Sequence, residues 1–76
     1  MLRKGFVVEV QVDHLVVRVT GTSYVASFCR MDDSTELIVR HVPFRDDHRA
    51  PMSRLDFFKS ALQLAKEKAQ ELKWIA

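Results

Sequence analysis

The chain has 76 residues, of which 47% are hydrophobic and 29% are charged, and its formal net charge is +2 at pH 7. This length fits one domain over residues 1–76, near the lower limit at which a core holds without disulfides or a metal. The composition argues against intrinsic disorder, and twelve basic residues against ten acidic ones leave the charge too balanced to indicate a partner.

Four strand-like segments and one helical segment follow one another along the chain. The strands are expected at residues 5–12, 15–20, 23–30 and 36–42, followed by a loop at 43–52 and a helix at 53–74. In "FVVEVQV" and "HLVVRVT", apolar residues recur at every second position, which is the period of a half-buried strand.

A two-residue turn at residues 13–14 is predicted to join the first two strands. This turn would place Val12 opposite Leu15, so that the apolar rows of both strands coincide. On the other face of the hairpin, Glu9 would then lie opposite Arg18 and form an ion pair with it.

Gly21 is predicted to form the second turn, because glycine adopts positive φ at low cost at the first central position of a hairpin turn. With residues 21–22 at the tip, the third strand continues the same apolar face. Cys29 would then lie opposite His14.

A polar connection at residues 31–35, "MDDST", is predicted to join the third and fourth strands. This register would place Phe28 against Ile38 and Arg30 against Glu36. The three hairpins then share one apolar face.

The last third of the chain has the period of a helix. Its apolar residues recur at spacings of three and four, at Leu55, Phe58, Leu62, Ala65, Ala69 and Leu72. Ser53 is a suitable N-cap with Asp56 three residues later, and Met52 and Phe57 occupy the positions of a hydrophobic staple. The start of the helix is therefore marked more clearly than its end.

The elements together predict an α+β fold, a four-stranded antiparallel meander with the C-terminal helix packed on one face (ββββα). This order of elements is similar to that of Pur-type repeats, whirly proteins and PC-type transcriptional coactivators, which bind single strands on a curved sheet. The resemblance lies in element order only, and no binding residue of those families maps onto this chain.

A second apolar surface is expected on the sheet face opposite the helix. The predicted register places six side chains there, Val7, Val16, Val25, Cys29, Leu37 and Val39. A helix of about 22 residues would also overhang the strands and expose Leu72, Trp74 and Ile75. Both surfaces are predicted to form a homodimer interface, although valines also favour strands without any partner.

The stretch "PFRDDHRAP" at residues 43–51 concentrates titratable side chains. Asp46, Asp47 and His48 are consecutive, so their side chains diverge, and no spaced pair of ligands lies nearby to complete a metal site with His41. We therefore predict a solvated connection without a metal or other cofactor. The loop is nevertheless longer than most connections.

Catalysis is not indicated by the sequence. The pair of Cys29 and His14 is the one arrangement that suggests a nucleophile and a base, but no glycine-rich loop or pocket accompanies it. We expect a protein that is not an enzyme.

The leading hypothesis is a small non-enzymatic binding or regulatory module that acts as a homodimer or binds another protein. The alternative is single-strand or duplex nucleic-acid binding around the 43–54 loop, through Phe44, Arg45, Arg49 and Arg54. A single cysteine favours the reducing cytoplasm, and the apolar runs fall far short of the ~20 residues of a membrane span.

Overall fold

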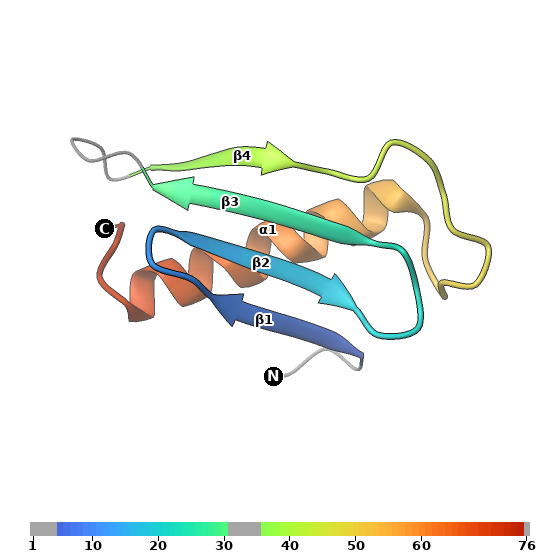
Figure 1. Ribbon diagram of the computed structural model, residues 1–76, viewed down its shortest axis with the longest axis horizontal. Helices are drawn as coiled ribbons and strands as arrows, with labels where there is room; N and C mark the ends of the chain where they lie inside the picture. The colour runs from blue at the N-terminus through green and yellow to red at the C-terminus, as the bar shows by residue number, and fades with distance from the viewer. Residues whose placement is uncertain (1–4, 31–35, 76) are drawn as a thin grey trace.

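The computed structural model describes residues 5–30 and 36–75. Its elements are β1 (Phe6–Val10), β2 (His14–Val19), β3 (Val25–Arg30), β4 (Leu37–His41) and α1 (Arg54–Glu71). The strands form one antiparallel sheet in the order β1-β2-β3-β4, and α1 lies along one face of it (Figure 1). The predicted ββββα fold is therefore confirmed.

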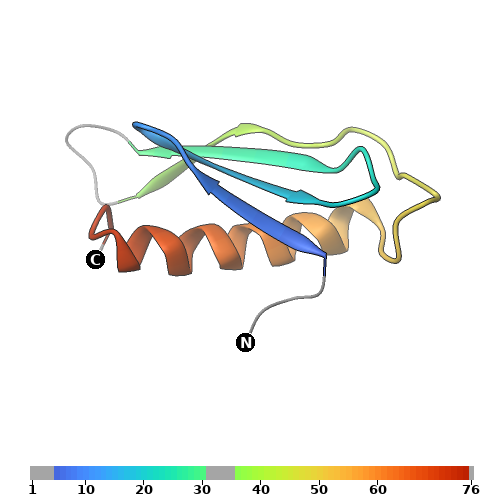
Figure 2. The same ribbon diagram turned by 60° about the horizontal axis from the view of Figure 1, so that its bottom comes forward.

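The molecule has two layers, the sheet and the helix (Figure 2). With 18 residues, α1 is ~27 Å long at 1.5 Å per residue. It packs mainly under β2 and β3. Within the described part of the chain no element covers the opposite side of the sheet, which we call the bare face.

The core lies between α1 and the two central strands. Phe57 of α1 is buried and stacks on Tyr24 and Phe6 at ring-centroid distances of 5.0 and 5.8 Å. Phe28 stacks on Phe58 at 6.3 Å. Burial of each large apolar side chain contributes about 1.5–3 kcal/mol, so these aromatic contacts hold the helix to the sheet.

The first hairpin turns one residue earlier than predicted. Gln11 donates its N–H to the carbonyl of His14 at 2.8 Å, so the turn consists of Val12 and Asp13. Val12 was expected in the apolar row, but it is 99% exposed at the tip. The alternating pattern could not distinguish a turn at residues 12–13 from one at 13–14, because both turns keep the apolar rows of the two strands on one face.

The register consequently moves by two residues, and each side chain of the first hairpin keeps its predicted face. Glu9 lies opposite Val16, and Arg18 lies opposite Val7. Arg18 and Glu9 still form an ion pair at 2.5 Å, diagonally across the bare face.

The second hairpin has the predicted register, with Leu15 opposite Phe28 and Cys29 opposite His14. Its tip differs, however, because Thr22 donates its N–H to the carbonyl of Val19 at 3.3 Å. Gly21 is therefore the second central residue of this turn, with a φ of 78°, and not the first.

The third hairpin is out of the predicted register by one residue. Phe28 lies opposite Val39 instead of Ile38, and Arg30 lies opposite Leu37. A one-residue slip exchanges the two faces, so the placement of Leu37 and Val39 on the bare face was wrong, and Ile38 lies there instead. A bulge at Ser27/Phe28 interrupts the ladder, and the predicted connection at 31–35 lies outside the described residues.

The helix begins as predicted, since the side chain of Ser53 accepts the N–H of Asp56 at 3.2 Å. Its buried side is rotated from the predicted stripe, however. Phe57, Ala61 and Leu64 point into the core, whereas Leu55 is 60% exposed.

The helix ends three residues earlier than predicted. Lys73 has a φ of 63°, and Trp74 donates its N–H to the carbonyl of Ala69 at 2.8 Å. This is a Schellman motif, which turns the chain back. The predicted overhang was therefore wrong: Leu72, Trp74 and Ile75 pack against the core, and the guanidinium of Arg30 lies 5.6 Å from the Trp74 ring centroid.

Candidate binding surfaces

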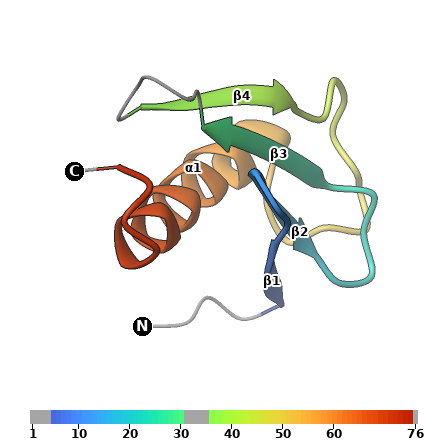
Figure 3. The same cartoon turned by 60° about the vertical axis from the view of Figure 1, so that its left-hand side comes forward.

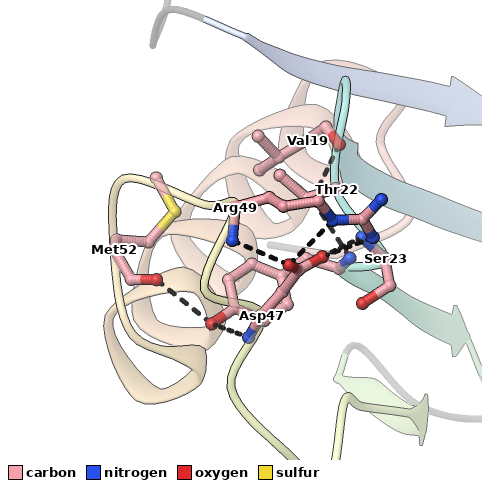
Figure 4. Close-up of polar contacts among 7 residues, drawn as sticks. Val19, Thr22, Ser23, Asp47, Arg49 and Met52 are labelled. Carbon is pink, nitrogen blue, oxygen red and sulfur yellow. Dashed lines mark hydrogen bonds and ion pairs between the residues drawn. The ribbon is translucent and has the colours of Figure 1, made fainter.

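The loop between β4 and α1 is fastened to the β2–β3 turn by Asp47, which is buried. Its carboxylate accepts the N–H of Ser23 at 2.7 Å (Figure 4). The backbone N–H of Arg49 donates to the same carboxylate at 2.9 Å, and its guanidinium donates from Nε and Nη2 at 3.1 and 3.0 Å. Asp47 therefore has a structural role, and Arg49 is engaged with it.

These contacts shift the pKa values of both Asp47 and Arg49. The guanidinium of Arg49, followed by the N–H groups of Ser23 and Arg49, holds the pKa of Asp47 well below its ordinary range. The hydrogen bonds and charge of Asp47 in turn raise the pKa of Arg49. Both groups are thus charged near neutral pH.

Tyr24 supports the same loop from the core. Its hydroxyl accepts the N–H of Asp47 at 3.1 Å and donates to the carbonyl of Met52, also at 3.1 Å. A buried tyrosine needs such partners for its polar end. The two ends of the 47–52 segment are thereby held by one side chain.

The N-terminus of α1 carries its own carboxylates. Asp46 accepts the N–H of Arg54 at 2.7 Å, and Asp56 lies in the first turn. A helix N-terminus favours anions, but here an acidic side chain of the loop already fills that role. This weakens the predicted anion site at Arg54.

Phe44 and Arg45 remain free to meet a partner. The Phe44 side chain is 80% exposed, and Arg45 is also exposed. Both line an open groove, together with Ser23, His41, Val42 and Pro43. Of the four residues predicted to contact nucleic acid, the sequence neighbours Phe44 and Arg45 line this groove, while Arg49 is bound to Asp47.

The residues considered for a metal or a nucleophile lie as follows. In the described ranges no three side chains of His, Cys, Asp or Glu gather where they could hold an ion. His14 lies opposite Cys29, but its Nδ1 is 3.0 Å from Asp13, and this hydrogen bond lowers the pKa of Asp13.

The bare face carries five apolar side chains that alternate with polar ones. From the sheet register its members are Val7, Val16, Val25, Cys29 and Ile38. Ile38 is exposed, and the other four side chains are partly exposed. The ion pair of Glu9 and Arg18 crosses this group, because the register places Arg18 between Val7 and Val25 and Glu9 beside Val16.

Sequence reasoning missed the role of Asp47 and the place of Ile38. The signal for Asp47 was its position two residues before Arg49, because aspartate often bonds the backbone two residues on. Nothing in the sequence indicated its bond to Ser23, which comes from a different part of the chain.

Comparison with known proteins adds no further evidence, since no family model, curated protein or solved structure matches this chain. The likeness to single-strand-binding folds therefore stays one of element order. Among the described residues, no helix has the length and apolar character required to cross a membrane.

Proposed function

We propose that this protein is a small non-enzymatic binding module that acts as a homodimer through the bare face. The observation that supports the proposal is that α1 covers one side of the sheet only. The other side carries Val7, Val16, Val25, Cys29 and Ile38. Apolar side chains exposed on an uncovered sheet face favour association, and here the ion pair of Arg18 and Glu9 lies among them.

The size of the face limits the affinity. Four strands spaced ~4.8 Å apart, with six residues of ~3.3 Å each, make a surface of roughly 19 by 20 Å. Its projected area of about 380 Å² is below the ~800 Å² per partner of a standard interface. We therefore expect a concentration-dependent dimer and not an obligate one.

Light scattering over a concentration series tests this proposal. The wild-type mass should rise towards that of a dimer, and Val25→Lys, at the first residue of β3 on the bare face, should remain monomeric. Val12→Lys is the matched control, because Val12 is exposed in the β1–β2 turn, away from the bare face. A wild-type protein that stays monomeric throughout would contradict the proposal.

A second candidate function is single-strand nucleic-acid binding at the groove beside β4. It is favoured by the exposed Phe44 ring next to Arg45, because bases stack on aromatic side chains while basic groups contact phosphates. Oligonucleotide titration at two salt concentrations, with Phe44→Ala and Arg45→Ala, tests it. Absence of binding at low salt would exclude it.

The proposed compartment is the cytoplasm. The support for it is Cys29, which is a free thiol on the sheet and suits a reducing environment. Localisation of the tagged full chain in cells tests this assignment.

A further inference from the structure

A further apolar surface lies on the helix side of the sheet, where β4 extends beyond α1. Because α1 packs mainly under β2 and β3, the helix side of β4 is left incompletely covered (Figure 3). Val39 lies on that side, opposite Phe28, and is 43% exposed.

The same region continues onto α1. Phe28 stacks on Phe58, so Val39 and Phe58 are both neighbours of one buried ring. Leu55 and Leu62 lie three residues before and four residues after Phe58, on the same side of the helix. We call these four residues, Val39, Leu55, Phe58 and Leu62, the α1–β4 strip.

The strip has a basic border. Lys59 is four residues after Leu55 and three before Leu62, and Lys66 is four residues after Leu62. Both lysines are exposed, and neither forms an ion pair with another described residue. Of the acidic residues of α1, Glu71 pairs with Lys68, Glu67 accepts a hydrogen bond from the neutral amide of Gln63 and keeps its charge, and Asp56 lies in the first turn, three residues before Lys59.

We propose that the α1–β4 strip binds a short acidic segment of another protein that also carries apolar side chains. The apolar row requires apolar groups in the partner, and the two unpaired lysines favour carboxylates beside them. Residues 55–62 span ~10 Å of helix, which matches about two turns of a partner helix in a helix-to-helix mode of recognition.

The apolar row and the ring geometry favour a protein partner over nucleic acid, because the charge of a lysine attracts phosphates as well as carboxylates. Phe58 is turned towards Phe28 and does not present a free stacking face. The strip is also separate from the bare face, so the proposal does not depend on the homodimer.

Selection of peptides tests the proposal. The immobilised full chain would be presented with random 12-residue peptides, and the selected sequences should combine Asp or Glu with Leu, Ile or Phe. Fluorescence anisotropy of a labelled selected peptide would then give Kd for each variant at two salt concentrations.

Two variants, each with a matched control, test whether the peptide binds at the α1–β4 strip. Leu55→Gln should raise Kd about tenfold, the effect of losing one buried leucine, whereas Val12→Gln, which removes an exposed apolar side chain elsewhere, should not. Lys59→Gln should raise Kd several-fold at low salt, whereas Gln11→Glu, with the same change in net charge, should leave it unchanged.

Several results would overturn the proposal. They are a selection without binders, binders that lack acidic residues, and binding insensitive to both Leu55→Gln and Lys59→Gln. A change of oligomeric state in Leu55→Gln would also overturn it, because the strip would then contact a second copy of the chain.

Discussion

The hydroxyl of Tyr24 lies 3.1 Å from the backbone nitrogen of Asp47 and accepts its N–H. This bond joins the residue before β3 to a loop 23 residues further along the chain. The same hydroxyl donates to Met52, so one core side chain holds both ends of the segment that leads into α1.

Tyr24→Phe should therefore destabilise the protein although it keeps the aromatic ring. The substitution leaves the Asp47 N–H and the Met52 carbonyl without their partner, and an unsatisfied buried polar group costs about 1–3 kcal/mol. Urea unfolding measures the change. Unaltered stability would show that water replaces the hydroxyl at no cost.

Asp47→Asn should reduce the dependence of stability on pH. Because the pKa of Asp47 is lowered in the folded state, its carboxylate stabilises the fold at pH values well above its unfolded pKa of about 3.9. That contribution is lost as the pH falls from about 5 towards the folded pKa. The wild-type unfolding free energy should thus decrease more steeply on acidification than that of Asp47→Asn, measured by urea unfolding at each pH.

The two curves should differ most near neutral pH and approach each other in acid. Asp13 also has a lowered pKa, but it is present in both proteins and cancels in the comparison. Parallel curves would contradict the assigned role of Asp47.

Lys73→Gly should stabilise the protein. Lys73 has a φ of 63° at the end of α1, a conformation that costs a residue with a Cβ atom roughly 1 kcal/mol and glycine almost nothing. Part of this gain is offset because glycine is more flexible in the unfolded chain. Thermal unfolding should show a higher Tm for Lys73→Gly and a lower one for Lys73→Val, and the opposite order would refute the Schellman geometry.

The fold was predictable where neighbouring residues determine it. Ser53 and Asp56 are three residues apart, so the helix start could be predicted from local chemistry. The register of the second hairpin followed in the same way, from the short connection around Gly21 and the alternating apolar residues on both sides.

The errors arose where distant contacts or irregular geometry decide the structure. The alternating pattern cannot indicate the bulge at Ser27/Phe28, and this irregular ladder accompanies the exchange of Leu37 and Ile38 between the two faces. The exposure of Leu55 depends on how α1 lies across the strands. The bond of Asp47 to Ser23 joins residues 24 apart, beyond any local motif.

The homodimer at the bare face can be tested most directly through Cys29, the single cysteine of the chain, which lies on that face and is partly exposed. Its rate of reaction with a thiol reagent would be measured from sub-micromolar to high-micromolar protein, for the wild type and for Val16→Lys. We predict that the wild-type rate falls as the concentration rises, since association covers the thiol, and that the rate in Val16→Lys stays constant. A wild-type rate that is independent of protein concentration would contradict the proposed interface.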